Sequence, residues 1–331
     1  MPLSISLPRP RPRRSVRSAL ACLAAASLLL AGCGDDDSGG DDTSPAASGG
    51  EFPVDVLSGP VDGGETITVE DEPTSIISLS PTTTEMLWAV GAGDQVVAVD
   101  DQSDYPEDIP VTELSGFEPN IEAILGYEPD LVLASGDTGG LVKGLEAVDV
   151  PVLLLPSAAD LDESYSQIER VGAATGHTDE AEKVVEEMRS GIEAAVDAAP
   201  DATGVTYFHE LGPDLFSVSS DTFIGQVYSL FGLENIADAA GEGDQYPQLS
   251  SEYVVSADPD LVFIGDNECC GVTPDDVAGR AGWEDMKAVR NDQLHLVDED
   301  MTSRWGPRVA DFAESISEIL TDNAEALGLQ D

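Results

Sequence analysis

Two arginines near the end of the chain have the type and spacing of an anion-binding pair. Arg304 and Arg308 flank Trp305-Gly306-Pro307, where Pro307 is typical of the first turn of a helix and Gly306 of its cap. Cations at a helix N-terminus are disfavoured by the helix dipole, so another interaction must stabilise them at this position. A shared anion is one, because helix amides and guanidinium groups both favour carboxylate or phenolate oxygens. An ion pair with one of the chain's many carboxylates is an equal alternative.

Four aromatic residues in loops after predicted strands are candidates for contacts with a large ligand: Tyr105, Phe117, Tyr246 and Trp305. A metal chelate or macrocycle is mostly apolar surface around a polar centre. Ring stacking would therefore supply affinity, and a few polar groups would orient the ligand. For each of these four residues, packing in the hydrophobic core is at least as common as contact with a ligand.

His209 and Glu210 end a predicted strand, so we expect this pair near the edge of the sheet where ligands bind. Two side chains are too few to hold a bare metal ion, and His177 and His295 are not placed to help. We therefore expect no directly bound metal and no cofactor, but a metal that arrives inside a chelate.

Cysteines are scarce in the body of the protein. Cys269 and Cys270 are adjacent and follow a predicted strand that ends at Ile264, which places them at the rim of the same edge. In an oxidising compartment they either form a vicinal disulfide or remain thiols, and a pair alone is too few for a zinc site.

The charge excludes one large class of function. The chain has 331 residues with 65 acidic and 14 basic side chains, a net charge of −51. A nucleic-acid-binding protein needs a basic face, so we expect no nucleic-acid partner. Hydrophobic residues make up 41% of the chain, which is too many for a disordered acidic protein, and the length favours about two domains.

Residues 1–32 have the pattern of a secretion signal. Five arginines precede an apolar run of about a dozen residues, which is too short for a spanning helix. The run ends in Leu30-Ala31-Gly32-Cys33, which resembles a bacterial lipobox, so we expect Cys33 to be acylated and to become the first residue of the mature chain. Without the signal, nine basic residues face 65 acidic ones, a net charge of −56.

Residues 33–51 are predicted to be an acidic tether. The segment is rich in Asp and Gly and has almost nothing apolar, so it cannot bury enough surface to order itself. A diacylated cysteine supplies two chains, enough for stable anchoring. We therefore expect contact with the membrane through the lipid anchor only, at the outer face of the cytoplasmic membrane.

Short β-branched runs alternate with helical patterns in the body, which is typical of an α/β fold with mainly parallel sheets. Each half of the body has about four predicted strands. They are 75–79, 96–99, 131–134 and 152–155 in the first half, and 205–209, 215–218, 261–264 and 294–297 in the second.

The segment Thr178 to Ala199 has one apolar stripe at helical spacing. It is predicted to be a long helix, either covering a single sheet or connecting two lobes. An internal repeat favours two lobes. Glu122 and Glu252 each precede a Pro-Asp-Leu-Val strand start by seven residues, at an offset of 130, and Gly91 and Gly232 form a second echo. We predict an N-terminal lobe (52–177), a connecting helix (178–199) and a C-terminal lobe (200–331), with a ligand cleft between similar lobes.

Several segments resemble a known family: the substrate-binding lipoproteins of ABC importers for ferric siderophores, haem and cobalamin. The resemblance extends from about Thr66 to Leu320. It is strongest in SIISLSPTTTEMLWAVGAGDQVVAVDDQSDYP from Ser75, NIEAILGYEPDLVLAS from Asn120, DTFIGQVYSLFGLENIADAA from Asp221 and YPQLSSEYVVSADPDLVFIGD from Tyr246. It implies two α/β lobes joined by a long helix, a monomer that holds its ligand between the lobes, and delivery to an ABC permease dimer with its ATPase subunits.

In that family one exposed glutamate on each lobe pairs with arginines of the permease, and Glu122 and Glu252 occupy the matching positions. Their equal spacing supports this role independently, since two related lobes would present one carboxylate each to a two-fold partner. The alternative is structural: each glutamate would stabilise the N-terminus of a helix through the helix dipole, in the first turn after the predicted N-caps Asn120 and Ser250.

The predicted function is therefore capture of a metal chelate, not catalysis. The paired arginines favour a ferric siderophore, with cobalamin or haem as alternatives; some cobalamin-binding relatives have tryptophan where this chain has Tyr246. A secreted α/β hydrolase is the competing class, but the sequence has no G-x-S-x-G, H-E-x-x-H or phosphate-loop motif. The excess acid itself suggests adaptation to a saline medium.

Overall fold

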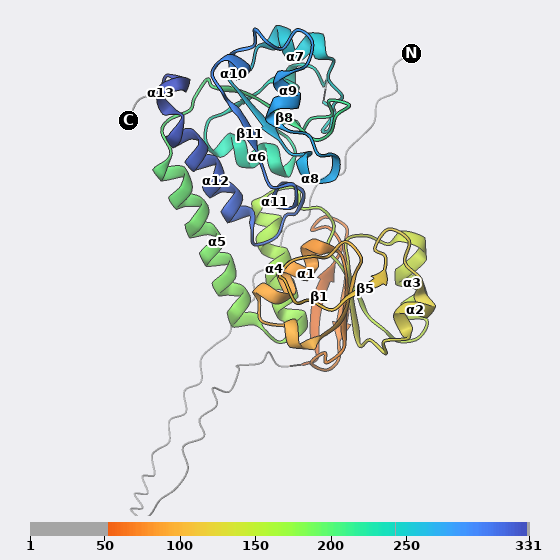
Figure 1. Ribbon diagram of the computed structural model, residues 1–331. Helices are drawn as coiled ribbons and strands as arrows, with labels where there is room; N and C mark the ends of the chain where they lie inside the picture. Colours follow the sequence, from red (N-terminus) through yellow and green to blue (C-terminus); the bar gives the residue numbers. More distant parts are fainter. Residues whose placement is uncertain (1–51, 242, 330–331) are drawn as a thin grey trace, which may run out of the picture. The chain divides into compact units, whose positions relative to one another are not determined.

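The computed structural model describes residues 52–241 and 243–329 (Figure 1). The predicted signal peptide, the acylated Cys33 and the acidic tether lie outside the described residues. Among the helices in the described part of the chain, none combines the length and the apolar character needed to cross a membrane.

The N-terminal lobe folds around a five-stranded parallel sheet. Its strands are β3 (Ile76–Leu79), β4 (Val96–Asp100), β5 (Val111–Leu114), β6 (Leu131–Ala134) and β7 (Val152–Leu154), and its short helices are α1 (Pro81–Ala89), α2 (Ile121–Leu125) and α3 (Leu141–Glu146). The order across the sheet is β5-β4-β3-β6-β7. Successive side chains point to opposite faces, so Ile76 belongs to the core that faces the long helices and Ile77 to a second core on the other face.

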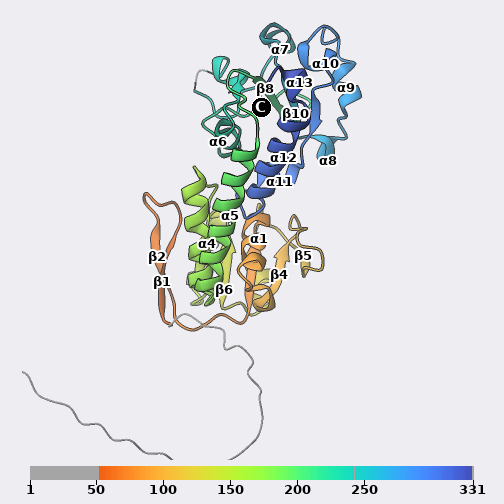
Figure 2. The ribbon, with the colours of Figure 1, turned by 90° about the vertical axis from the view of Figure 1, so that its left-hand side faces the viewer.

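An antiparallel hairpin stands beside this sheet. It consists of β1 (Val54–Ser58) and β2 (Glu65–Val69), and the Ser58 hydroxyl donates a 3.0 Å hydrogen bond to the Val152 carbonyl on β7. Figure 2 shows the hairpin next to α4 (Leu161–Thr175). The sequence analysis missed these two strands, although Val54 and Val56, and Ile67 and Val69, have the alternation of apolar and polar residues that is typical of a strand with one covered face.

The C-terminal lobe repeats the plan with a four-stranded parallel sheet. Its strands are β8 (Thr206–Glu210), β9 (Glu234–Asn235), β10 (Leu261–Ile264) and β11 (Leu294–Leu296), in the order β11-β10-β8-β9. Its helices are α6 (Phe223–Leu230), α7 (Ser251–Ala257), α8 (Asn267–Cys270), α9 (Pro274–Ala278), α10 (Lys287–Arg290), α11 (Glu299–Ser303), α12 (Val309–Asp322) and α13 (Ala324–Leu327).

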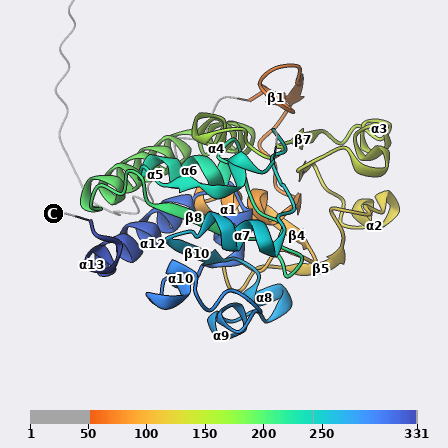
Figure 3. The same ribbon diagram turned by 90° about the horizontal axis from the view of Figure 1, so that it is seen from above.

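The long helix predicted at Thr178 is observed as α5 (Thr178–Ala198). It begins beside α4 of the N-terminal lobe and runs along α12 (Figures 1 and 3). Its buried residues are spaced three or four apart, the spacing of one helix face: Ala181, Val185, Met188, Ile192 and Ala195. They belong to one core cluster that also contains residues of α1 and α12, so the two lobes share a continuous apolar core.

The Pro-Asp repeat has the same structural role in both lobes. Asp130 accepts hydrogen bonds from the backbone N–H groups of Thr74 (2.9 Å) and Ser75 (3.0 Å), just before β3. Asp260 accepts from the backbone N–H (3.0 Å) and the hydroxyl (2.8 Å) of Thr206, the first residue of β8. Each carboxylate therefore fixes the start of the neighbouring central strand.

The chain also turns in the same way before each of these aspartates. Glu128 and Asp258 both adopt a left-handed backbone, with φ of 53° and 50°. Gly91 and Gly232, the second echo in the sequence, have φ of 86° and 77°, which favours glycine because it has no Cβ. The two similar α/β lobes predicted from the sequence are thus confirmed.

One predicted strand was wrong. Residues 215–218 form only a single antiparallel bridge, between Phe216 and Gln248. Leu215 has a positive φ of 63°, so the chain bends where a strand would need an extended backbone. β5 and β9 were missed because both are short and partly exposed.

Candidate functional site

Two adjoining cavities lie where the carboxyl ends of the strands meet, and we call them together the cleft. One, of about 710 Å³, is lined from the N-terminal lobe by residues after β3, β4 and β6, among them Ser80, Gln102 and Ser135. The other, of about 440 Å³, is lined by residues after β8 and β10, including Leu211 and Gly265. Both cavities share Ser157, Glu299, Ser303, Arg304 and Trp305, so the segment 299–305 forms a common wall.

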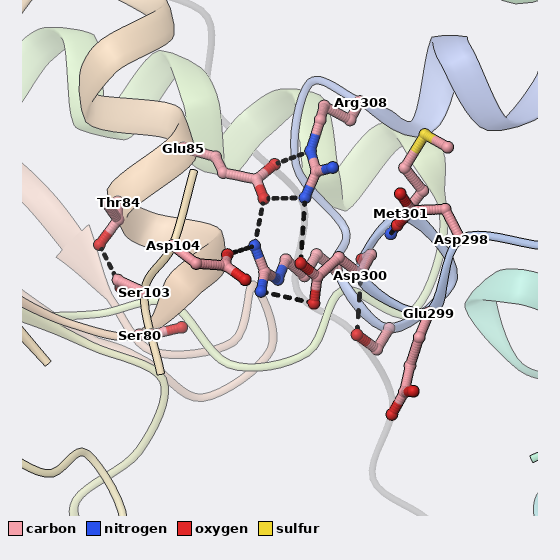
Figure 4. Close-up of polar contacts among 12 residues, drawn as sticks. Ser80, Thr84, Glu85, Ser103, Asp104, Asp298, Glu299, Asp300, Met301 and Arg308 are labelled. Carbon is pink, nitrogen blue, oxygen red and sulfur yellow. Dashed lines mark hydrogen bonds and ion pairs between the residues drawn. The ribbon is translucent and has the colours of Figure 1, made fainter. Parts of the chain in front are cut away.

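Arg304 and Arg308 form one ion network with Glu85, Asp104 and Asp300. Figure 4 shows Arg308 beside Glu85, with Asp104 and Asp300 close by. Arg304 Nη1 donates to Glu85 Oε1 and to Asp104 Oδ1, both at 2.8 Å, and Arg304 Nη2 lies 2.6 Å from Asp300 Oδ1. Arg308 donates to both oxygens of Glu85, at 3.1 Å and 2.6 Å. Of the two alternatives for these arginines, the structure shows the ion pair with a protein carboxylate, Glu85.

The helix start at this point was predicted two residues early. Residues 306–308 form a turn in which Val309 N–H donates to the Gly306 carbonyl, and α12 begins at Val309 with Arg308 as its N-cap. This turn allows both arginines to reach Glu85 on α1.

The network perturbs the titration of its members. Burial opposes the charged form of Arg304, but the bonds to Asp104 and Glu85 outweigh it and raise the pKa of Arg304. Burial raises the pKa of Asp300 to about 6, and the nearby negative charge of Asp104 adds to this against the opposing effect of Arg304. Asp104 itself has a lowered pKa, because its bond to Arg304 outweighs its partial burial.

The predicted aromatic contacts divide into two groups. Phe117 and Tyr246, with exposed fractions of 76% and 51%, line the larger and the smaller cavity, and Trp305 lines both. The Trp305 indole donates a 2.8 Å hydrogen bond to Gln167, which fixes the ring. Tyr105 lies outside both linings and packs under the Arg308 guanidinium, 4.4 Å from the ring centroid. Arg308 itself also lines neither cavity.

His209 was expected near the cleft but is completely buried behind it. Its Nδ1 lies 2.9 Å from the Tyr228 hydroxyl, and its Nε2 would lie 3.0 Å from a Cβ at Gly265, so a larger residue there would require the His209 ring to shift. Burial lowers the pKa of His209 to about 4. Glu210 faces the other side of the sheet, where Arg280 donates to both of its oxygens at 2.6 Å and 2.5 Å.

Cys269 and Cys270 are exposed at the end of α8 and are joined as a disulfide. The backbone N–H of Cys269 donates a 2.9 Å hydrogen bond to Glu299, which lines both cavities. The disulfide therefore contacts the cleft wall through Glu299 but does not itself line either cavity.

Glu122 and Glu252 are the second residues of α2 and α7, and both are exposed. The preceding Asn120 and Ser250 accept from the backbone N–H groups of Ala123 and Tyr253, as N-caps do. The two carboxylates therefore occupy matching positions on the two lobes.

Sequence reasoning missed Glu85, which pairs with both arginines, and the acids that line the cleft, namely Asp100, Asp104, Asp221, Glu299 and Asp300. In a chain with 65 acidic residues, the type alone does not show which ones face a site. Glu85 did carry a signal, because it is an acid within the buried helix segment Thr82–Leu87. Over the described ranges, no group of three or more His, Cys, Asp or Glu side chains is placed to hold a metal ion.

Two similar α/β lobes, a long connecting helix and a cleft at the strand ends define a substrate-binding protein that holds a small molecule between its lobes. A family model described as periplasmic binding protein matches residues 76–301, and the chain belongs to this family. It is a binding protein and not an enzyme.

Individual relatives agree with this assignment. An uncharacterised ABC transporter substrate-binding lipoprotein of Bacillus subtilis, YvrC, is 30% identical over 309 residues, which cover 90% of this chain and 95% of the relative. A vitamin B12-binding protein of Pectobacterium carotovorum is 31% identical over 257 residues, covering 75% of this chain and 89% of the relative. The crystal structure of the vitamin B12-binding protein BtuF of Vibrio cholerae superposes with a TM-score of 0.62 at 25% identity, covering 77% of this chain and 99% of that chain.

The protein is thus an extracytoplasmic substrate-binding protein of an ABC transporter. Such proteins work with a permease and an ATPase.

Proposed function

We propose that this protein captures a large metal chelate in the cleft and delivers it to its permease. The observation that carries the proposal is the cleft itself, where strand ends of both lobes meet around Phe117, Tyr246 and Trp305. A chelate with a broad apolar surface would gain affinity from these rings, while the serine, glutamine and acidic side chains around them would orient it.

The candidate ligands are a ferric siderophore, a corrinoid and haem. The siderophore prediction was based on Arg304 and Arg308, but in the structure both arginines are bonded to protein carboxylates. The corrinoid is supported by the names of the relatives from Pectobacterium and Vibrio. We therefore place a corrinoid first and keep a ferric siderophore as the second candidate.

Tryptophan fluorescence provides a direct test. The chain has three tryptophans; Trp283 is fully buried in the C-terminal lobe, and Trp305 lines both cavities. Titration with cyanocobalamin, a ferric hydroxamate and haemin should quench the fluorescence with the ligand that the protein binds. The conservative variant Trp305→Phe should lose most of this quenching while keeping a similar affinity. Absence of binding to every chelate would overturn the proposal.

Delivery requires docking, for which we propose Glu122 and Glu252 as the contacts of the two lobes with cationic groups of a two-fold permease. Their exposure and their matching positions in α2 and α7 support this role. We further propose that acylated Cys33 and the acidic tether hold a monomer at the outer face of the cytoplasmic membrane.

A further inference from the structure

The charges in the cleft limit the kind of chelate that it can accept. Among the residues that line the two cavities, only Arg304 is basic, whereas five are acidic: Asp100, Asp104, Asp221, Glu299 and Asp300. Aromatic faces, which carry partial negative charge, add to the attraction for cations. The lining as a whole is therefore negative.

The positive charge of Arg304 does not neutralise the negative lining that a ligand would meet. It lies within 2.8 Å of carboxylate oxygens of Glu85, Asp104 and Asp300, so its single charge is already more than balanced. It is also only 8% exposed, whereas Asp104, on the cleft side, is 61% exposed. An approaching ligand thus meets the carboxylate of Asp104 more readily than the guanidinium behind it.

Burial perturbs the titration of two acids in the lining. The pKa of Asp300 is raised to about 6 by burial and by the charge of Asp104, although Arg304 is in contact with it. Asp100, buried beneath the larger cavity, also has a raised pKa, caused by burial and then by Asp101 against the hydrogen bond from Ser103. An anion buried in this space would meet the same cost of desolvation.

We propose that the cleft selects uncharged or cationic chelates and rejects anionic ones. The inference rests on the proposed function, since it concerns the ligand of the same site. It separates the candidates by class: a corrinoid with intact amides or a cationic ferric hydroxamate fits, whereas a ferric catecholate or the carboxylates of haem do not.

Two ligand scaffolds with variable charge test the proposal. Aquacobalamin is cationic, cyanocobalamin is uncharged, and a cobalamin with a side-chain amide hydrolysed to a carboxylate is anionic. Ferrioxamine B carries an ammonium group, and its N-succinyl derivative carries a carboxylate instead. On the scaffold that binds, we expect the cationic member to bind roughly three- to tenfold more tightly than the anionic member at low salt, with the difference shrinking as salt is added.

A matched pair of variants assigns the effect to the cleft. Asp104→Asn keeps the shape of the side chain and removes one negative charge beside Arg304, so the preference for the cation should fall roughly threefold or more. Glu186→Gln makes the same charge change on the exposed side of α5 and should leave the preference intact. Tighter binding of the anionic members overturns the charge selection but not the proposed function. An equal change of the cation preference in Asp104→Asn and Glu186→Gln has the same consequence. Binding of haemin in place of both scaffolds overturns this inference alone, whereas absence of binding by both scaffolds and by haemin overturns the proposed function as well.

Discussion

Arg304 donates a 2.8 Å hydrogen bond to Glu85, although 219 residues separate them in the sequence. Both side chains are almost fully buried, at 8% and 1% exposure. Glu85 belongs to α1 of the N-terminal lobe, and Arg304 immediately follows α11 of the C-terminal lobe. The pair therefore ties the two lobes together beside the cleft.

Loss of Glu85 should destabilise the protein strongly. The variant Glu85→Gln leaves the buried Arg304 and the half-buried Arg308 without their common carboxylate, and removal of one partner of a buried ion pair costs about 3–5 kcal/mol. Urea denaturation measures the change in the free energy of unfolding. The control Glu187→Gln removes the exposed pair between Lys183 and Glu187 and should cost less than about 0.5 kcal/mol. Equal effects of the two variants would contradict a structural role for the network.

The equivalent aspartates of the two lobes should have equivalent effects on stability. Asp130→Asn and Asp260→Asn each weaken charge-assisted hydrogen bonds at a strand start, and each should cost about 1–2 kcal/mol. Burial opposes ionisation of Asp260, but the bonds from Thr206 and Lys287 lower its pKa. Its contribution is therefore present above its unfolded pKa of about 3.9 and is lost as the pH falls through the lower folded pKa. Denaturation curves of Asp260→Asn and the unchanged protein should converge in acid; a gap that widens there would exclude this explanation.

The sequence allowed prediction of those parts of the fold that depend on local pattern. Buried strands such as β6 and β10 are continuous apolar runs, α5 has one apolar stripe, and the repeated Pro-Asp is visible without a structure. The partners of the charges were not predictable, because the pairing of Arg304 with Glu85 depends on the closure of two lobes across 219 residues. The position of His209 was missed for a related reason: strand alternation turned it into the core, while Glu210 faces the other side.

Asp266 should make the protein less stable as the pH rises. It is fully buried two residues after the end of β10, and neither of its oxygens has a hydrogen-bond partner among the described residues. Burial, and then the charge of Glu210, raise its pKa to about 6, above the unfolded value of about 3.9. The folded state thus holds this proton more tightly, so stability is lost as the pH rises from about 4 to about 6.

Asp266→Asn tests this directly, because the amide cannot ionise. The variant should gain on the order of 2 kcal/mol over the unchanged protein at pH 8 and much less near pH 4.5. Urea denaturation at both pH values measures the difference. A constant difference at both values would show that the charge of Asp266 is not the cause.

Reversal of both docking charges should stop transport and leave ligand binding unchanged. Glu122→Arg with Glu252→Arg places like charges opposite the cationic groups expected on the permease, and both positions are exposed and line neither cavity of the cleft. Uptake of labelled chelate into cells measures transport, and fluorescence titration measures affinity. Glu182→Arg with Glu186→Arg, on the exposed side of α5, is the charge-matched control and should still support uptake. Retained uptake by the docking double variant would disprove the assignment.

The net charge of −51 predicts a melting temperature that rises with salt. Like charges repel in the folded state, and screening shortens their reach from about 10 Å at 0.1 M salt to about 3 Å at 1 M. Calorimetry in increasing NaCl measures the shift. A variant with Glu182, Glu186 and Glu193 of α5 changed to Gln has less repulsion to screen, so its melting temperature should depend less on salt. If the melting temperature of the unchanged protein does not rise, its acidic surface is not an adaptation to a saline medium.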